Sequence, residues 1–309
     1  MANNAVVIGT GMMGPGIALT LALGGLRAAI LSRSMETAEA GLAKARAQLA
    51  LLAEAGVADQ DKAARGHELL SATADFDGAV AGADLVIESA PENMAFKQDL
   101  FARMDALAKP DAILASNTSG LSITAIASRC TRPERVLTTH FWNPPHLMPL
   151  VEIVRGDKTD PAKAEAVREL LISCGKKAVV VKKDTPGQLG NRLQMALVRE
   201  AAHIVESGIA DAEAVDEVVR SGFGLRMPVY GVFEHQDIVG LDMASAILEY
   251  VSTDLYSEPR APQIVRDLVA RGDLGAKTGR GFHDWTKKDA AQVKERRDRF
   301  VLDFLQRWR

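Results

Sequence analysis

The sequence predicts an α/β fold, with an N-terminal Rossmann-like, doubly wound and mostly parallel sheet and a C-terminal all-helical domain. The first observation behind this prediction is that short apolar runs alternate with helix-like stretches as far as Val181, as in a parallel sheet covered by helices. The second is that the alternation stops after Pro186, where helix-like stretches follow one another. We therefore predict a Rossmann-like domain at residues 1–185 and an all-helical domain at residues 186–309.

The predicted strands are short apolar runs that end at glycines or polar residues, as do strands buried on both faces. These runs occupy residues 5–8, 28–31, 85–87, 113–115, 136–139, 150–154 and 178–181. The predicted helices of the first domain occupy residues 17–26, 35–54, 96–108, 122–128 and 162–173. Those of the second domain occupy residues 188–207, 211–221, 240–250, 262–271 and 290–308.

Composition places the chain among ordinary globular proteins, because it is 47% hydrophobic and 25% charged. A net charge of -3 and a pI near 6.1 give no indication of nucleic-acid or membrane-surface binding. The longest apolar stretch, residues 17–26, is too short to span a bilayer, and the N-terminus does not resemble a signal peptide. Cys130 and Cys174 lack metal-ligand spacing, so a protein of the reducing cytoplasm is expected.

A glycine-rich segment joins the first predicted strand to the first predicted helix. Gly9 permits a tight turn, Gly11 lets the backbone approach a pyrophosphate, and Gly14 allows the helix to pack closely on the strand. Met12 and Met13 complete the loop, which opens a helix whose N-terminus favours phosphate. Because this pattern lies between a strand and a helix, it predicts a dinucleotide site rather than only a tight turn.

The end of the second predicted strand bears on which cofactor is expected. NAD sites usually carry an acid there that accepts hydrogen bonds from the ribose hydroxyls, but this sequence has Ser32, Arg33 and Ser34. An arginine flanked by hydroxyls suits the 2′-phosphate of NADP, so we expect NAD or NADP with a slight preference for NADP. Arg33 also fits a solvated loop residue, or one that stacks on the adenine of NAD.

Polar residues lie at strand ends in the middle of the chain, where ligands of an open α/β sheet collect. Ser119 follows the strand at 113–115, and His140 ends the next strand. Glu152 lies in an apolar run and needs a partner, because a lone buried charge is costly. A His140–Glu152 pair suits removal of a hydroxyl proton as hydride leaves the carbon, with Ser119 and Asn143 near the substrate oxygen. The alternative is a structural His140 and an exposed Glu152.

Several stretches resemble the 3-hydroxyacyl-CoA dehydrogenase family, in order and over nearly the whole chain. They are GTGMMGPGIA, ADLVIESAPEN, SNTSG, HFWNPPHLMPLVEIV, KKDTPGQLGNRL, FEHQDIVGLD and LGAKTGRGFHDW. The resemblance implies an NAD(P)-dependent enzyme that interconverts a 3-hydroxyacyl-CoA, such as 3-hydroxybutyryl-CoA, and its 3-oxo form. It also implies a homodimer formed through the helical domain.

The resemblance assigns roles to individual residues. His140 matches the family's catalytic base, and Glu152 matches the carboxylate partner of that base. Ser119 and Asn191 match polar residues on the substrate side, although Asn191 alone would read as a helix cap. Further cofactor contacts are expected at Ala90, Glu92, Lys97 and Asn117. Without the resemblance, Lys97 also fits an ordinary surface position on a helix.

Departures from the family pattern leave the substrate open. Gly120 replaces a second serine, and Asn143 is followed by Pro-Pro-His rather than by a single proline. Relatives with the latter variant include enzymes acting on small carboxylates without coenzyme A, among them one that oxidises a pyridine-carboxylate aldehyde. A free hydroxy acid or aromatic carboxylate is therefore the alternative substrate, with Arg226 as a candidate clamp for its carboxylate.

A non-catalytic, cofactor-binding protein resembling the lens crystallins is an alternative of another class. The intact set of candidate catalytic residues argues against it. His203, His235 and His283 lack ligand spacing, so no metal site is expected. The expected partners are a small-molecule substrate and a second copy of the chain, without nucleic acid or membrane.

Overall fold

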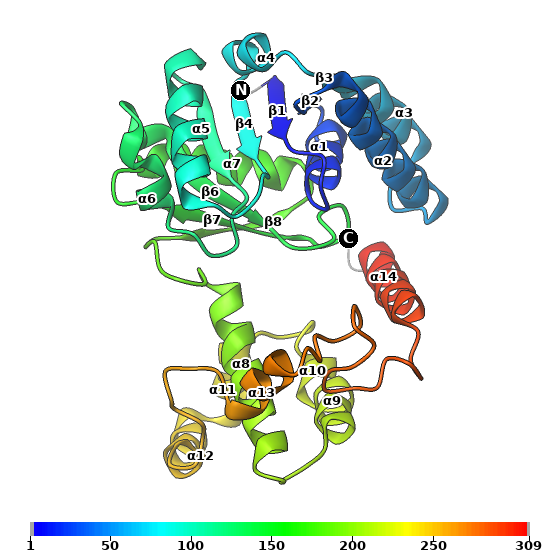
Figure 1. The fold of residues 1–309 in the computed structure, drawn as a ribbon, viewed down its shortest axis with the longest axis vertical. Coiled ribbons are helices and arrows are strands. Elements are labelled where there is room, and N and C mark those ends of the chain that lie inside the picture. The colour runs from blue at the N-terminus through cyan, green and yellow to red at the C-terminus, as the bar shows by residue number, and fades with distance from the viewer. Residues whose placement is uncertain (1–2, 308–309) are drawn as a thin grey trace. The chain divides into compact units, whose positions relative to one another are not determined.

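A computed structural model describes residues 3–307, which form two compact units (Figure 1). The first unit runs to Arg192 and also takes in the chain from Arg296 onward, whereas the second is Leu193–Glu295. The sequence-based division at residue 186 instead assigns the whole C-terminal part to one domain, and it remains a proposal for the functional domains.

The first unit is built on one eight-stranded sheet. Its strands are β1 (Asn4–Ile8), β2 (Arg27–Leu31), β3 (Leu70–Thr73), β4 (Leu85–Glu88), β5 (Ile113–Ser116), β6 (Val136–Phe141), β7 (Leu150–Arg155) and β8 (Lys177–Val181). The spatial order is β3-β2-β1-β4-β5-β6-β7-β8, and every pairing is parallel except β6 with β7. The carboxyl ends of β1 to β6 therefore share an edge with the amino ends of β7 and β8. The predicted mostly parallel, doubly wound sheet is confirmed.

Helices cover both faces of this sheet. They are α1 (Gly14–Leu23), α2 (Met35–Glu54), α3 (Gln60–Leu69), α4 (Phe76–Gly82), α5 (Met94–Leu107), α6 (Ile123–Ile126) and α7 (Pro161–Ser173). The last helix, α14 (Ala290–Arg307), returns to the first unit with its final turns. The predicted end of this helix at Trp308 lies outside the described residues.

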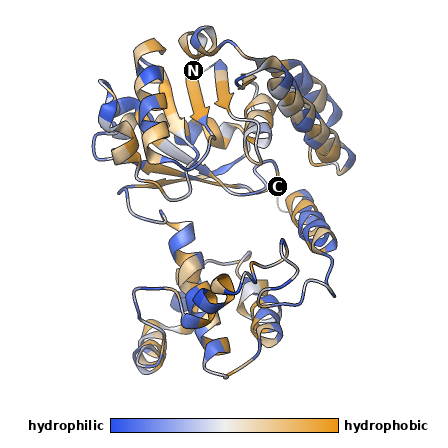
Figure 2. Cartoon of the chain, in the orientation of Figure 1, coloured by the Kyte–Doolittle hydropathy of each residue, from blue (hydrophilic) through white to orange (hydrophobic). Residues whose placement is uncertain are grey.

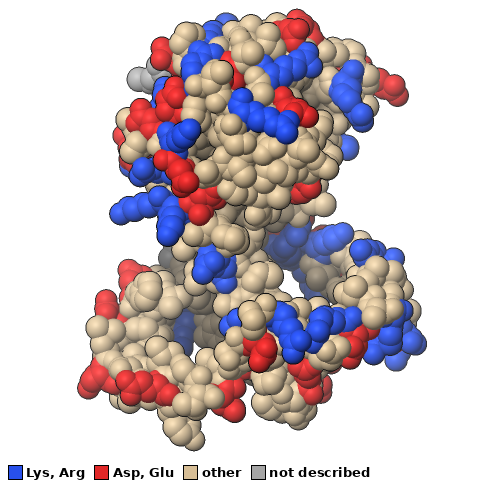
Figure 3. Space-filling model, turned by 60° about the vertical axis from the view of Figure 1, so that its left-hand side comes forward, with Lys and Arg blue, Asp and Glu red and all other residues tan. Residues whose placement is uncertain are grey.

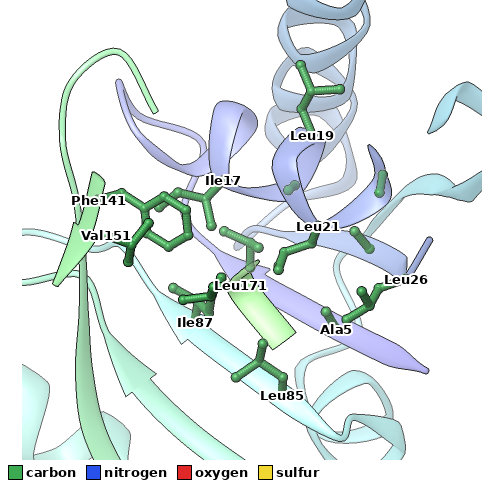
Figure 4. Packing of buried hydrophobic residues seen from close by; sticks show 14 of the residues in the cluster. Ala5, Ile17, Leu19, Leu21, Leu26, Leu85, Ile87, Phe141, Val151 and Leu171 are labelled. Carbon is green, nitrogen blue, oxygen red and sulfur yellow. The ribbon is translucent and has the colours of Figure 1, made fainter. Parts of the chain in front are cut away.

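The core of the first unit consists of two apolar clusters, one on each face of the sheet. Alternate strand residues face opposite sides, so Val7 and Ile87 join one cluster whereas Val6 and Val86 join the other. Figure 4 shows the first cluster, with Ile17 and other residues of α1 gathered beside strand residues. Strands β1 and β4 are accordingly among the clearly hydrophobic segments in Figure 2. Burial on both faces explains why these strands read as continuous apolar runs.

The sequence did not predict β3, α3 and α4. In β3 only Leu70 is buried, and in α3 only Gly66 is, so neither segment shows an apolar run or stripe. The first helix also begins at Gly14, three residues before its predicted start at residue 17, with Pro15 in its first turn. Proline suits this place because the N–H it lacks has no partner within the helix.

The second unit is helical. Helix α8 (Gly190–Glu206) leads into it, followed by α9 (Ala212–Ser221), α10 (Phe223–Arg226), α11 (Val232–Val239), α12 (Leu241–Ser252) and α13 (Gln263–Ala270). The short helices α10 and α11 were not predicted. In α9 to α13 no residue is buried, and large apolar side chains lie exposed on them.

Nothing in the described part of the chain is a helix both long and apolar enough to cross a bilayer. Basic and acidic side chains are interspersed over the face shown in Figure 3, with uncharged surface between them. This mixed surface agrees with the near-neutral net charge.

Candidate active site

The glycine loop between β1 and α1 has the geometry of a phosphate cradle. Gly9 has a φ of +118°, and a Cβ there would lie 2.4 Å from the carbonyl oxygen of Ser89. A Cβ on Gly14 would lie 1.9 Å from the carbonyl oxygen of Gly9, whereas one on Gly11 would meet nothing within 4 Å. Gly9 and Gly14 are thus required by the fold, but Gly11 leaves open space.

That open space fits a dinucleotide pyrophosphate. Met13 precedes helix α1 as its N-cap residue, and its side chain makes no capping hydrogen bond, so the first amides of the helix are not occupied by the capping side chain. Oriented amides at a helix N-terminus attract phosphate. Met12 is 73% exposed beside them, so it is available to a bound cofactor.

Hydroxyl groups rather than a carboxylate lie at the end of β2. The Oγ of Ser32 is 2.7 Å from Oγ1 of Thr37, and Ser34 caps α2 by accepting from the amide of Thr37. The side chain of Arg33 is exposed. These groups fit the ribose end of either NAD or NADP, since both offer ribose hydroxyls.

A buried ion pair supports the loops after β4 and β5. Lys97 is 1% exposed, and its Nζ donates to Glu88 Oε1 at 2.6 Å. Glu88 also accepts from the amide of Ala90 and from the Oγ of Ser116, each at 2.6 Å. The alternative interpretation of Lys97 as a surface residue is therefore wrong. Sequence reasoning missed Glu88, although it is an acid in an apolar strand, the same signal that identified Glu152.

Glu92 joins this ion pair to the loop after β5. Its carboxylate lies 3.5 Å from Lys97 Nζ and accepts from Thr118 Oγ1 at 2.9 Å and from the amide of Ser119 at 2.8 Å. Asn117 Oδ1 accepts from the amide of Phe141 at 2.9 Å, directly beside His140. The candidate cofactor residues Glu92, Lys97 and Asn117 thus form one network with the carboxyl end of β6.

His140 and Glu152 form a buried pair on neighbouring strands. The Nδ1 of His140 is 2.8 Å from Oε2 of Glu152, and the two side chains are 6% and 1% exposed. Glu152 Oε2 also accepts from the indole of Trp142 at 3.1 Å. Its Oε1 accepts from the amides of Leu189 and Gly190, at 3.0 and 2.8 Å. The alternative of an exposed Glu152 is therefore wrong.

The environment keeps Glu152 ionised. Burial raises the pKa of its carboxyl, but hydrogen bonds from His140, the Gly190 amide and Trp142 outweigh burial and hold that pKa below its usual range. A charged Glu152 favours the His140 tautomer with a proton on Nδ1 and stabilises the imidazolium form. Nε2 is then the ring nitrogen left to exchange a proton with a ligand.

Ser119 and Asn191 are brought together at the same edge, since Asn191 Nδ2 donates to the carbonyl of Ser119 at 3.1 Å. Gln188, which sequence reasoning missed, is buried with a φ of 54° and donates from Nε2 to the carbonyl of Thr118 at 2.9 Å. This donor ties the turn before α8 to the loop after β5. Arg226 ends α10 in the second unit, and the structure describes it within that unit.

The loop after β6 carries Asn143, whose side chain is exposed. Lys176 holds this loop by donating from Nζ to the carbonyls of Pro145 and Met148, at 2.6 and 2.9 Å. Burial, together with the charge of nearby Lys176, lowers the pKa of His146 to about 4, so His146 is uncharged near neutral pH. Among residues 3–307, no group of three or more potential metal ligands is gathered.

Both parts of the chain match models of one protein family. The 3-hydroxyacyl-CoA dehydrogenase NAD binding domain matches residues 4–185, and the C-terminal domain of the same family matches residues 187–285. Among related proteins, a 5-formyl-3-hydroxy-2-methylpyridine 4-carboxylate 5-dehydrogenase of Mesorhizobium japonicum is 37% identical over 309 residues, or 98% of this chain and 97% of that protein. A probable 3-hydroxybutyryl-CoA dehydrogenase of Bacillus subtilis is 39% identical over 284 residues, or 92% and 97%.

Solved structures give the same result. A 5-formyl-3-hydroxy-2-methylpyridine 4-carboxylic acid 5-dehydrogenase, described as an NAD+-dependent dismutase, matches with a TM-score of 0.91 at 34% identity over 99% of both chains. A 3-hydroxybutyryl-CoA dehydrogenase from Escherichia coli K12 matches with a TM-score of 0.77 at 33% identity, over 93% of this chain and 60% of that one. With both domains matched in order, the chain belongs to the 3-hydroxyacyl-CoA dehydrogenase family of oxidoreductases.

Proposed function

We propose that this protein is an NAD(P)-dependent dehydrogenase in which His140 takes the proton of a substrate hydroxyl. The observation that carries the proposal is the buried His140–Glu152 pair at the sheet edge that also carries the glycine loop. When bound, the nicotinamide ring supplies the acceptor of the hydride. The remaining chemistry is a proton transfer, which a histidine oriented by a carboxylate performs near neutral pH.

The roles of the chain's own residues follow from their contacts. Glu152 holds Nδ1 of His140, so Nε2 receives the hydroxyl proton and Glu152 stabilises the resulting imidazolium. Ser119 and Asn191 are proposed to bind the substrate oxygen, and the hydrogen bond from the Asn191 side chain to the Ser119 carbonyl supports a shared position. In the reverse direction the same imidazolium returns the proton to a carbonyl oxygen.

For the cofactor, we propose NAD or NADP at the glycine loop. The match to an NAD binding domain supports NAD. The exposed Arg33 and the hydroxyls of Ser32 and Ser34 support acceptance of a 2′-phosphate. The ratio of activities with NADH and NADPH decides between them.

For the substrate, we propose a small aromatic carboxylate without coenzyme A, oxidised at an alcohol or hydrated aldehyde carbon. The relative and the solved structure named for a pyridine carboxylate both align along almost the whole chain. Arg226 is the candidate clamp for the substrate carboxylate. The second candidate is a 3-hydroxyacyl-CoA, which the Bacillus subtilis relative supports.

The test is a panel of paired substrates followed by nicotinamide absorbance. It contains acetoacetyl-CoA and free acetoacetate with NADH or NADPH, and a pyridine carboxylate aldehyde with NAD+ or NADP+. We expect turnover of the aldehyde and little with the thioester. Strong activity with acetoacetyl-CoA alone would assign the acyl-CoA substrate, and no turnover across the panel despite cofactor binding would contradict the proposed function.

We also infer that the helical unit forms a homodimer. Phe233 of α11, Ile238 of α11 and Tyr250 of α12 are 83%, 75% and 83% exposed, and exposed apolar groups of this size are typical of association surfaces. A second copy of the chain is the partner that the family resemblance indicates. Light scattering after gel filtration should give twice the chain mass, and Phe233→Glu should reduce it towards the monomer.

A further inference from the structure

Trp142 places a second donor on the carboxylate oxygen that holds His140. The residue directly follows β6, and its Nε1 donates to Glu152 Oε2 at 3.1 Å. The same oxygen lies 2.8 Å from Nδ1 of His140. The two rings are 5.6 Å apart and tilted by 50°, so the indole also limits how far the imidazole can turn.

Gly190 leaves the space that the indole occupies. A Cβ at Gly190 would lie 2.4 Å from Cζ2 of Trp142 and 3.3 Å from Oε2 of Glu152. A separation of 2.4 Å is far below van der Waals contact, so any side chain at position 190 would displace the indole. The amide of Gly190 meanwhile donates to Glu152 Oε1. Trp142 and Gly190 therefore fit one another at a single carboxylate.

We propose that Trp142 is a positioning residue that tunes the His140–Glu152 pair, and that position 190 is glycine in order to admit its indole. The inference rests on the proposed function, in which that pair moves the substrate proton. An acceptor oxygen that serves two donors binds each of them less strongly than it would bind one alone. The indole thus weakens the hold of Glu152 on the Nδ1 proton, so the imidazolium is less stabilised and the proton on its Nε2 returns more readily to the substrate.

The groups around the His140–Glu152 pair allow the effect of the indole hydrogen bond to be separated from that of a change in charge. The charged side chain that acts on Glu152 is His140 itself, from β6, and the other donors are the neutral indole and the backbone amides of Leu189 and Gly190 before and at the start of α8. Removing the indole N–H therefore changes the hydrogen bonding of the carboxylate without removing a charge.

The test is a titration of the His140 imidazole by NMR, without substrate, with its signal identified by its loss in His140→Gln. Trp142→Phe should raise the titration midpoint by about half a pH unit, an increase of about threefold in proton affinity. Replacement of Trp142 by benzothienylalanine, which keeps the shape but lacks the N–H, should give a similar rise. An unchanged or lower midpoint in this isosteric variant would overturn the proposal.

Gly190→Ala tests the fit between the two residues. It should move the midpoint in the same direction as Trp142→Phe, and it should add little in the Trp142→Phe background, because a phenyl ring extends less far than an indole. Gly82→Ala is the control, since a Cβ there meets nothing within 4 Å, and it should leave the midpoint unchanged. Additive shifts would show that the two positions act independently. Because the titration needs no turnover, its outcome is independent of the substrate assays.

Discussion

Glu152 lies directly opposite His140 in the antiparallel pairing of β6 and β7, and its Oε2 is 2.8 Å from Nδ1 of His140. Residues paired in this way point to the same face of a sheet, so the strand register alone brings the two side chains together. Both are almost inaccessible to solvent, and a buried polar group that loses its partner is not compensated by water. The pair is therefore a fixed part of the sheet.

Glu152→Gln should lower turnover by about 10²-fold to 10⁴-fold while cofactor affinity is retained. The carboxylate accepts from donors on both oxygens, whereas an amide offers one oxygen and turns an NH2 group towards the remaining donors. The favoured His140 tautomer is then lost. Steady-state kinetics with the active substrate and cofactor titration by fluorescence measure the two quantities.

The control for this variant is Glu165→Gln on α7, where the acid is solvent-exposed and pairs with Arg168. It should change turnover by less than about twofold, because exposed ion pairs contribute little. Equal effects of the two substitutions, or near wild-type turnover of Glu152→Gln, would contradict the role of the pair.

Two glycines of one loop should respond in opposite ways to the same substitution. Gly14→Ala places a Cβ 1.9 Å from the carbonyl oxygen of Gly9 and should lower the melting temperature by several degrees. Gly11→Ala meets no protein atom within 4 Å, so it should leave the melting temperature nearly unchanged but weaken cofactor binding by about tenfold or more. Thermal scans with and without cofactor make the comparison. Full cofactor affinity in Gly11→Ala would place the pyrophosphate elsewhere.

Much of this architecture can be predicted from the sequence, because a strand that is buried on both faces consists of consecutive apolar residues. Strands β1, β4 and β5 are covered on both faces and read as apolar runs, whereas β3 shows no such run because only Leu70 is buried. The return of α14 to the first unit was not predictable. Its contacts, such as Gln306 with the carbonyl of Ala55, join residues far apart in the sequence.

In the candidate site too, contacts between residues far apart in the sequence could not be predicted. Glu152 was recognisable as an acid that needs a partner, but the Trp142 and Gly190 contacts depend on where the chain turns before α8. Lys97 has the sequence surroundings of a surface helix residue, and only the tertiary fold shows that it is buried against Glu88. Side chains whose role depends on distant segments carry little local signal.

Lys97→Met should be strongly destabilising, because it leaves the carboxylate of Glu88 buried without its cation. Loss of one member of a buried ion pair typically costs about 3–5 kcal/mol. The double variant Lys97→Met/Glu88→Gln removes the uncompensated charge as well and should recover part of that loss. Urea unfolding of the wild type, Lys97→Met and the double variant gives the free energy of unfolding of each. A double variant that is less stable than Lys97→Met would contradict this account.

Asp84 should make the fold stability depend on pH. The hydrogen bond from Lys109, together with those from the amides of Asn3 and Asn4, outweighs burial and lowers the pKa of Asp84 to about 2. A carboxyl whose pKa is lower in the folded than in the unfolded state contributes stability above its unfolded value of 3.8 and loses it as the pH falls towards 2. Asp84→Asn should therefore unfold at a lower urea concentration than the wild type at about pH 7. This gap between the two urea midpoints should narrow as the pH approaches about 3.

The control is Asp77→Asn, which loses only the exposed pair with Arg103. Its urea midpoint should stay near that of the wild type at every pH. A gap for Asp84→Asn that is constant over the same range would mean that the lost stability comes from packing rather than from charge.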